Sequence, residues 1–188
     1  IGARIVEGIT DLPLAGVPLA VHAGAQPDFQ LGSVGAGRGM SCFQLKGGIG
    51  SASRIAPVVG VGDYMVGALV LANFGKLPLL TIAGQAIGTR LQALQDAHDD
   101  SPEKGSIIIL IATDAPLDAR QLRRVSSRAA AGLCRTGSIF GHGSGDIALA
   151  FSTAYTVPHL PGPDMPVLQL LHDAVLVPLF HACGEGVE

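Results

Sequence analysis

Residues 96–113 read DAHDDSPEKGSIIILIAT and join the most polar segment of the chain to its most apolar one. Residues 96–105 are almost wholly polar, with a proline and a terminal glycine, which is typical of a linker. Residues 107–113 are an unbroken β-branched and aliphatic run, which predicts a buried strand. The change falls at Gly105-Ser106, so the sequence places a serine at the first position of a core strand.

A serine in this position suits the nucleophile of an N-terminal-nucleophile hydrolase. Such an enzyme activates itself by cutting its own chain. The Ser106 hydroxyl would attack the Gly105 carbonyl, and an N→O acyl shift followed by hydrolysis would leave Ser106 as a new N-terminus. Gly105 would allow backbone strain and keep its carbonyl uncovered. The new α-amino group, with an ordinary pKa of about 8, could assist the hydroxyl as a base. Taken alone, however, Gly-Ser more often marks an ordinary junction between a loop and a strand.

The segments around this junction predict a mixed α/β domain. Residues 54–61 and 63–72 have the composition of two strands joined by a turn, and both faces of the second are apolar. A helix is expected to start at Asp114-Ala115-Pro116 and to end around Thr136-Gly137. The other expected elements are strands at 5–14, 17–22, 79–82 and 147–153, a short helix at 91–96, a loop at 161–166, and a last helix from Pro178 to Glu188. The predicted architecture therefore has strands buried on both faces and helices outside them.

The composition narrows the classes of function. The chain has 188 residues, 48% of them hydrophobic and 14% charged, which fits a single domain over residues 1–188. Its net charge of −3, without a Lys/Arg run or any Trp, argues against a nucleic-acid partner. The apolar stretches at 65–72 and 107–112 are too short to span a bilayer, so no membrane segment is expected. Because the chain begins at Ile1 without Met, we expect it to be a section of a longer protein.

Neither a metal site nor a cofactor site is indicated. The three cysteines, Cys42, Cys134 and Cys183, form no CxxC pair, and the six histidines show no HExxH pattern. We interpret the thiols as reduced and mostly buried, as in a cytoplasmic protein. Residues 32–50 contain seven glycines, but neither the GxxxxGK[ST] nor the GxGxxG register of a phosphate-binding loop is present.

Residues 141–146, GHGSGD, precede the strand expected at 147–153 and carry a serine and a carboxylate two positions apart. At a strand entrance, both side chains can face one cavity. Ser144 could relay a hydrogen bond to Ser106, and Asp146 could orient Ser144 and hold charge. The alternative is a glycine-rich turn with an Asp cap, which composition alone favours.

Asn73 ends the strand expected at 63–72 and precedes Phe74-Gly75. The amide N–H of an asparagine at a strand end can point at a developing oxyanion, and such a donor typically contributes about 3 kcal/mol of transition-state stabilisation. An ordinary turn residue is the alternative, and the sequence alone favours it.

Together, these segments resemble one family, the DmpA-like aminopeptidases, which include the D-aminopeptidase/esterases and the β-peptidyl aminopeptidases. The resemblance covers roughly residues 32–188, and the segment GSIIILIATDAPL at 105–117 is highly specific. The other matching segments, in the family's order and approximate spacing, are GAGRGM at 35–40, FQLKGGIGSASR at 43–54, VLANFG at 70–75, RTGS at 135–138 and GSGDIALAFST at 143–153.

The resemblance implies both a fold and a processing event. The fold would be a four-layer αββα sandwich, similar to that of the N-terminal-nucleophile hydrolases but with different connectivity. Self-cleavage after Gly105 would divide the chain into residues 1–105 and 106–188 and would expose Ser106 as the nucleophile.

The resemblance also implies the rest of the catalytic group. Ser144 and Asp146 would complete it, and Asn73 matches the family's oxyanion-hole asparagine. The family also uses Glu at the position of Asp146, so Asp keeps the charge on a shorter arm. Neither Tyr64 nor Tyr155 lies in the context of the family's active-site tyrosine.

The leading hypothesis is therefore a cytoplasmic serine aminopeptidase or amidase-esterase, which releases N-terminal residues from short peptides, amides or esters. It would need no metal or cofactor, would bind neither nucleic acid nor membrane, and would form a homo-oligomer. An acyltransferase of the ornithine acetyltransferase type shares the architecture but normally uses Thr as its nucleophile, so Ser106 speaks against it. A non-catalytic relative that serves as a binding or assembly module is the third possibility.

Overall fold

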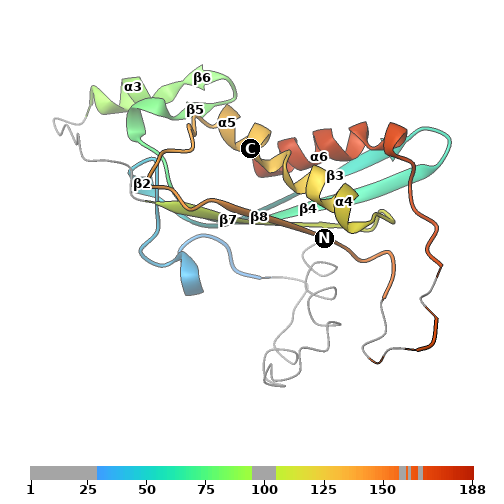
Figure 1. Cartoon of the computed structure of the whole chain (residues 1–188). Coiled ribbons are helices and arrows are strands. Elements are labelled where there is room, and N and C mark those ends of the chain that lie inside the picture. The colour runs from blue at the N-terminus through green and yellow to red at the C-terminus, as the bar shows by residue number, and fades with distance from the viewer. Residues whose placement is uncertain (1–28, 95–104, 157–159, 161, 165–166) are drawn as a thin grey trace.

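A computed structural model of the chain describes residues 29–94, 105–156, 160, 162–164 and 167–188. At the centre of these residues is a four-stranded sheet with strand order β3-β4-β7-β8, and helices α4, α5 and α6 lie on one side of it (Figure 1). The strands are β3 (Gly48–Val58), β4 (Gly62–Asn73), β7 (Ser106–Thr113) and β8 (Ile147–Ser152). The helices are α4 (Ala119–Ser126), α5 (Ala129–Arg135) and α6 (Val177–Val187). The smaller elements are η1 (Gly35–Gly37), β1 (Ser41–Cys42), β2 (Leu45–Lys46), η2 (Leu77–Leu79), β5 (Thr81–Ile82), β6 (Gln85–Ala86), α3 (Ile87–Gln92) and η3 (Asp173–Val175).

The pairing of the strands decides which of their ends meet. β3 and β4 form a long antiparallel hairpin, whose turn is closed by a hydrogen bond from Val61 N to Val58 O (3.0 Å). β4 is also antiparallel to β7, whereas β8 runs parallel to β7. A parallel pair needs a crossover connection, and α4 and α5 supply it on the helical side. As a result, the end of β4 and the starts of β7 and β8 lie at the same edge of the sheet.

The core lies between the sheet and the helices, and the alternation of side chains along β7 builds much of it. Ile107, Ile109 and Ile111 are each at most 3% exposed and face the helices. Full burial of each isoleucine contributes about 1.5–3 kcal/mol. Ile108, between them, lies on the opposite face and is 43% exposed. This strand was expected to be buried on both faces, but the described residues cover only one. We call the other side the open face.

The mixed α/β class predicted from the sequence is confirmed by this arrangement. The described residues supply one central sheet and the helical layer packed on it, which correspond to two adjacent layers of the expected αββα sandwich. None of the described helices is both long and apolar enough to cross a membrane.

Strand β3 begins at Gly48 rather than at the predicted Arg54, inside the segment that is densest in glycine. Glycine has a low strand propensity, which is why the sequence predicts a later start. In the structure Gly48 and Gly50 pair with Ala72 and Val70 of β4, so the backbone ladder overrides the propensity. The second predicted strand, at 63–72, is confirmed as β4.

The helix predicted from Asp114 begins later, because Asp118 is the residue that caps α4. The Asp118 carboxylate accepts a hydrogen bond from Gln121 N (2.6 Å), and Gln121 Oε1 accepts one from Asp118 N (3.0 Å). This reciprocal pair is a capping box, which satisfies two backbone donors that a helix start otherwise leaves open. Asp114 instead accepts a hydrogen bond from Met65 N of β4 (2.7 Å).

The same predicted helix is divided into α4 and α5. The hydroxyls of Ser126 and Ser127 both donate to the Arg123 carbonyl, at 3.0 and 2.7 Å. Serine side chains that bond back to helix carbonyls compete with the backbone ladder and bend helices. Two such serines at the end of α4 are a physical reason for the break.

The other predicted elements are found with shifted limits or lie outside the described residues. The strand at 147–153 and the last helix from Pro178 are confirmed as β8 and α6. The strand at 79–82 is reduced to β5, and the short helix at 91–96 lies earlier, as α3. The strands expected at 5–14 and 17–22, the linker before Gly105 and part of the loop at 161–166 lie outside the described residues.

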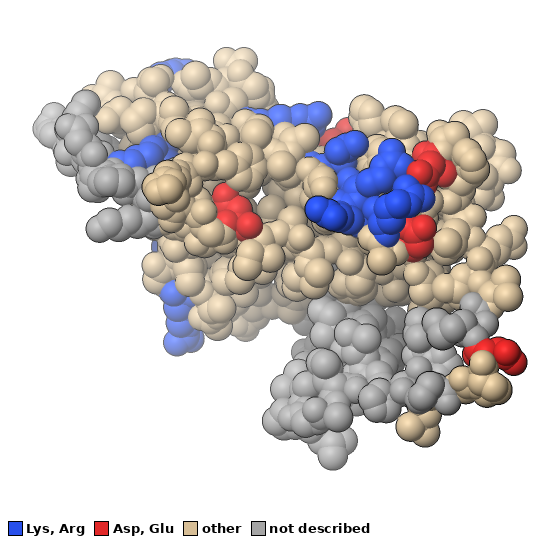
Figure 2. All heavy atoms as spheres, viewed as in Figure 1, with Lys and Arg blue, Asp and Glu red and all other residues tan. Residues whose placement is uncertain are grey.

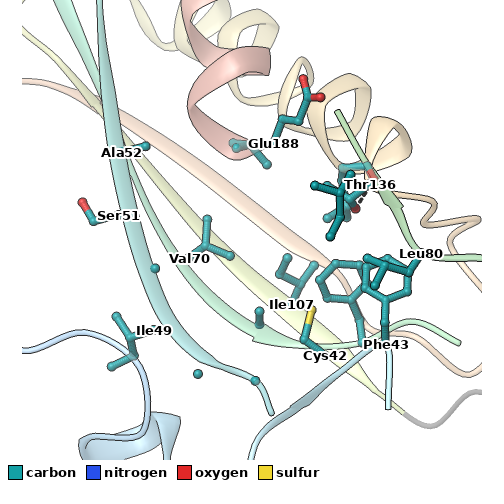
Figure 3. A pocket seen from close by; sticks show the side chains of 18 of the residues that line it. Cys42, Phe43, Ile49, Ser51, Ala52, Val70, Leu80, Ile107, Thr136 and Glu188 are labelled. Atoms are coloured by element: carbon teal, nitrogen blue, oxygen red, sulfur yellow. Dashed lines mark hydrogen bonds between the residues drawn. The ribbon is translucent and has the colours of Figure 1, made fainter. Parts of the chain in front are cut away.

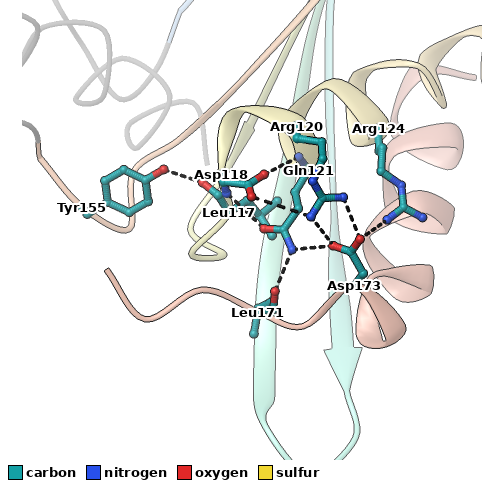
Figure 4. A network of polar contacts seen from close by, with 8 residues as sticks. All are labelled: Leu117, Asp118, Arg120, Gln121, Arg124, Tyr155, Leu171 and Asp173. Atoms are coloured by element: carbon teal, nitrogen blue, oxygen red, sulfur yellow. Dashed lines mark hydrogen bonds and ion pairs between the residues drawn. The ribbon is translucent and has the colours of Figure 1, made fainter. Parts of the chain in front are cut away.

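A polar network around Asp173 fastens the segment before α6 to α4 (Figure 4). Both oxygens of Asp173 accept hydrogen bonds from Arg120 (2.7 and 2.9 Å), and Arg124 lies 3.0 Å from the same carboxylate. The buried Gln121 donates to Asp173 (2.9 Å) and to the Leu171 carbonyl (2.7 Å). Figure 2 shows Lys and Arg side chains gathered next to acidic side chains on one face of the molecule. Arg120 and Arg124 both form ion pairs with the Asp173 carboxylate.

We expect replacement of Asp173 by Asn to lower the melting temperature at neutral pH by a few degrees. Hydrogen bonds from Arg120 hold the pKa of Asp173 well below its ordinary value. An acid with a lowered pKa stabilises the fold above its unfolded pKa, near 4, and this stabilisation is lost as the pH falls further. Because the group is exposed, solvent screens the effect. Melting curves from pH 7 to pH 2 should show a gap between variant and wild type that narrows only below about pH 4. Asp164→Asn is the matched control, and an equal gap in that variant would contradict the prediction.

The three cysteines are free thiols in different surroundings. Cys183 is fully buried in the core, and Cys42 is partly buried. Burial raises the pKa of Cys42 to about 11 and that of Cys183 to about 12. Cys134 is exposed, so the expectation that the thiols are mostly buried is wrong for this residue.

Iodoacetamide is therefore expected to modify Cys134 first in the native protein at pH 8. The reactive species is the thiolate, and burial both hides Cys42 and Cys183 and keeps them protonated. Mass spectrometry should find one fast label in the native state and three in denaturant, and Cys134→Ser should remove the fast one. Fast native labelling of Cys183 would contradict its placement in the core.

Candidate active site

Ser106 and Asn73 face each other across two neighbouring strands. The register of β4 and β7 pairs Asn73, the last residue of β4, with Ser106, the first residue of β7. Directly paired residues in a sheet present their side chains on the same face. Because Ile107 points to the helices, Ser106 and Asn73 lie on the open face, where Ser106 is exposed and Asn73 is half-buried. The structure thus brings together two residues that are separated in the sequence by a whole polar linker.

Gly105 packs so closely against the end of β4 that no side chain fits. A Cβ atom at this position would lie 2.3 Å from Asn73 O, which is far inside van der Waals contact. The Ser106 hydroxyl donates to the Gly105 carbonyl oxygen at 2.7 Å. The hydroxyl therefore lies beside the peptide group that the sequence analysis singled out, and the glycine allows that peptide group to approach the sheet.

Ser144 and Asp146 lie on the turn that leads into β8. The turn is tightened by a hydrogen bond from Ser144 N to Gly141 O (2.9 Å). The Ser144 hydroxyl donates to Asp146 Oδ1 at 2.5 Å, and the same oxygen accepts a hydrogen bond from Ile107 N (3.2 Å). Asp146 thus connects Ser144 to the residue that follows Ser106. The parallel pairing of β8 with β7 places this turn beside the start of β7.

The direct contact between this turn and the nucleophile candidate comes from Gly145. Its backbone N–H donates to Ser106 Oγ at 3.1 Å, and a Cβ at this position would lie only 3.3 Å from the same oxygen. Gly145 is not among the site residues predicted from the sequence. The glycine-rich sequence of residues 141–146 could have indicated this contact, since a glycine lets a backbone N–H approach a side chain closely.

The amide of Asn73 is held in one orientation. Its Oδ1 accepts a hydrogen bond from the backbone N–H of Ser41 at 3.0 Å. An N–H group cannot bond to the NH2 end of an asparagine, so the amide nitrogen must be directed elsewhere as a donor. Ser41 was also missed from the sequence, because a backbone donor has no sequence signature.

This arrangement provides the parts of an acyl-transfer centre. It combines an exposed hydroxyl, a backbone N–H donor on that hydroxyl, a serine-carboxylate pair next to it, and an oriented amide across the strand. Oxyanion stabilisation needs donors of this kind, fixed before the reaction. Among the described residues, no group of three or more His, Cys, Asp or Glu side chains could hold a metal ion.

A cavity of about 540 Å³ lies elsewhere, on the helical side of the sheet (Figure 3). Its lining includes Val70, Ile107 and Leu80, and Glu188, paired with Arg135 at 3.1 Å, lies at its border. Because Ile107 and Ser106 point to opposite faces of β7, the sheet separates this cavity from the Ser106 hydroxyl. This cavity is therefore not the site of the nucleophile candidate.

Residues 10–188 match the sequence profile of Peptidase family S58. Over 181 residues the chain is 38% identical to the β-peptidyl aminopeptidase BapA of Sphingosinicella microcystinivorans, and the alignment covers 90% of this chain but 46% of that protein. The chain therefore spans about half the length of this curated relative.

Solved structures agree with this match. The PH0078 protein of Pyrococcus horikoshii OT3 is similar with a TM-score of 0.78 and 49% identity, over 92% of this chain and 48% of that one. The L-aminopeptidase D-Ala-esterase/amidase of Ochrobactrum anthropi, a prototype of the serine aminopeptidases with a variant of the Ntn hydrolase fold, gives a TM-score of 0.76 and 37% identity, over 92% and 48%. The expected resemblance to the N-terminal-nucleophile hydrolase fold is thereby confirmed.

Proposed function

The chain belongs to peptidase family S58, and from this premise we propose that it carries the self-processing centre of a serine aminopeptidase or amidase-esterase. The enzyme releases N-terminal residues from short peptides, amides or esters. The names of its relatives, a β-peptidyl aminopeptidase and an L-aminopeptidase D-Ala-esterase/amidase, support this class of reaction. The observation that carries the proposal is the position of Ser106, which begins β7 opposite Asn73 and accepts the Gly145 N–H.

The first reaction of this centre is cleavage of its own chain. Ser106 Oγ bonds to the Gly105 carbonyl carbon, its proton passes to the peptide nitrogen, and the carbon–nitrogen bond breaks to give an ester. Water hydrolyses the ester, which leaves Gly105 as a carboxylate and Ser106 with a free hydroxyl and a free α-amino group. The 2.7 Å contact between Ser106 Oγ and Gly105 O supports this step, since it keeps the hydroxyl beside its target.

The second reaction uses the same hydroxyl on a substrate. Ser106 Oγ attacks the carbonyl carbon of the substrate's N-terminal residue, and the free α-amino group of Ser106 accepts the hydroxyl proton. The proton is then delivered to the departing amine or alcohol, and an acyl-enzyme remains. Water attacks this ester, releases the acid and restores Ser106. Asn73 donates its amide N–H to the oxyanion in both halves of the reaction.

Ser144 and Asp146 act as a pair beside the nucleophile. Asp146 accepts hydrogen bonds from both Ser144 Oγ and Ile107 N, so it fixes the serine side chain and the backbone of the residue after Ser106. A negative charge near the new N-terminus also stabilises the protonated α-amino group that forms during attack. The pair therefore sets both the geometry and the electrostatics of the nucleophile.

Intact-mass measurement of the purified protein tests the proposal. We expect two chains whose masses divide between Gly105 and Ser106, together with hydrolysis of amino acid p-nitroanilides that have a free amino group. A single uncut chain that hydrolyses these substrates at a normal rate would contradict self-processing, and a cut chain without any hydrolysis would contradict the aminopeptidase assignment.

We also propose that the protein is a cytoplasmic homo-oligomer. The free thiols support a reducing compartment. The open face supports assembly, because it leaves Ile108, Ile147 and Leu149 exposed at 43%, 58% and 57%. Light scattering coupled to size-exclusion chromatography should give a mass of at least two copies, and a monomeric mass would contradict the oligomer.

A further inference from the structure

The small hairpin of β1 and β2, residues 41–46, lies against the end of β4 at the candidate site. We call this segment the Ser41–Lys46 hairpin. It is attached by hydrogen bonds from Ser41 N to Asn73 Oδ1 (3.0 Å) and from Phe43 N to Phe74 O (2.7 Å). A third bond runs from Leu77 N to Gln44 Oε1 (3.0 Å). Three hydrogen bonds thus join the hairpin to the segment that runs from Asn73 to Leu77.

The turn of this hairpin has an unfavourable sequence for its conformation. The pairing of Cys42 with Leu45 leaves Phe43 and Gln44 as the two turn residues, with φ of 50° and 60°. Two-residue hairpin turns with positive φ at both positions strongly favour Asn and Gly. Other residues in such a turn have a strained backbone, and contacts elsewhere must stabilise this conformation.

The contacts of both turn residues lie beside Asn73. The Phe43 ring is 2% exposed and meets the Phe74 ring in an edge-to-face arrangement with centroids 5.1 Å apart. Gln44 supplies the acceptor for Leu77 N. The strained residues therefore tie the hairpin to the segment that directly follows Asn73, which fixes the distance between the hairpin backbone and the Asn73 side chain.

The Ser41 N–H is the part of the hairpin that contacts the candidate site. In a two-residue hairpin the closing pair, Cys42 and Leu45, carries the ladder hydrogen bonds, so the N–H of the next residue points away from its partner strand. That N–H is directed to Asn73 instead. Because it can bond only to Oδ1, it forces the Asn73 amide to present its NH2 end as the remaining donor.

We propose that the Ser41–Lys46 hairpin is the positioning element of the oxyanion donor, and that Ser41 acts through its backbone N–H to set the orientation of Asn73. This inference rests on the proposed function, in which Asn73 donates to the oxyanion. Ser41 is a positioning residue, since only its backbone contacts Asn73, and its hydroxyl has no part in the proposal. The contacts of Phe43 and Gln44 with the segment after Asn73 account for their presence at turn positions that suit glycine.

The test removes the Ser41 N–H without changing a side chain. Incorporation of the α-hydroxy acid analogue of serine at position 41 of the full chain replaces the amide with an ester, and Ser41→Ala is the matched control that keeps the N–H. We expect the ester variant to lower kcat and the rate of self-cleavage by about 10- to 100-fold, with KM nearly unchanged. Affinity for a peptide boronic acid, which forms a tetrahedral adduct with Ser106, should fall by a similar factor. Ser41→Ala keeps the N–H, so its kcat and boronic-acid affinity should fall far less than those of the ester variant.

A second variant covers the case in which the ester lowers stability. Gln44→Gly places glycine at a positive-φ position and so relieves the turn, but it removes the acceptor for Leu77 N. We expect it to remain folded and to lower kcat about threefold to tenfold, again with KM unchanged. Wild-type kcat and boronic-acid affinity in the ester variant, or in Gln44→Gly if the ester variant does not fold, would overturn the inference. Failure of the proposed function itself would be distinct, because the wild-type protein would then neither self-cleave nor bind the boronic acid.

Discussion

Replacing Ser106 by alanine is expected to leave the chain uncut between residues 105 and 106 and to lower kcat by a factor of about 10⁴ or more. The substitution removes the protein atom that bonds to the acyl carbon in both proposed reactions, before water attacks the ester. It keeps the backbone pairing with Asn73, and the exposed position tolerates a methyl group, so the fold should persist. Intact mass, melting temperature and the rate of p-nitroanilide hydrolysis measure these effects.

Ser127→Ala is the matched control for this prediction. Ser127 is also exposed, and its hydroxyl donates to the Arg123 carbonyl of α4, outside the candidate site. The control protein should be cut and active. Hydrolysis by Ser106→Ala at the rate of this control would show that Ser106 is not the nucleophile, and a cut Ser106→Ala chain would show that another group cleaves it.

The sequence alone could predict the strand that carries Ser106, because residues 107–113 form one uninterrupted run of β-branched and aliphatic residues. The same composition predicts burial on both faces, whereas the described residues bury only the face toward the helices. Ser144 and Asp146 could be placed before β8 for a related reason, since a glycine-rich turn and an apolar strand adjoin each other there. Local composition is informative where one segment decides its own conformation.

The limits of the helix between β7 and β8 could not be predicted in the same way. The predicted start at Asp114 is wrong because of a tertiary contact: the Asp114 carboxylate accepts a hydrogen bond from Met65 N, and Asp118 caps α4 instead. The start of β3 at Gly48 likewise depends on its partner strand rather than on its own residues. The limits of an element cannot be predicted from its own residues where contacts with a distant segment determine them.

Part of the candidate site could not be predicted from the sequence, for the same reason. Its side chains are visible in the sequence, but two of its donors are the backbone N–H groups of Gly145 and Ser41. Every residue except proline has such a group, so only the fold shows which ones matter. A glycine at position 145 is consistent with the close approach of its backbone to Ser106 Oγ. The residue type at position 41 gives no such signal.

Replacing Asn73 by aspartate is expected to lower kcat by about 10²- to 10³-fold or more while leaving the fold nearly unchanged. Aspartate has the shape of asparagine and still offers an oxygen to the Ser41 N–H, so the contact with the Ser41–Lys46 hairpin survives. The NH2 donor is lost, and a negative charge takes its place where the reaction develops another negative charge. The prediction therefore separates a catalytic role of the amide from a structural role of the same side chain.

Asn73→Ala provides the comparison that makes this result decisive. Alanine removes both the donor and the acceptor, so it should reduce stability as well as kcat, because Ser41 N–H loses its partner. If Asn73 stabilises the transition state, the Asn73→Asp variant should have the lower kcat of the two and the higher melting temperature. If Asn73 only holds the hairpin, aspartate should turn over substrate almost as well as the wild type, and alanine should be impaired in stability first. Thermal melts and steady-state kinetics on the two variants distinguish these outcomes, and near-wild-type kcat in Asn73→Asp would remove the asparagine from the oxyanion site.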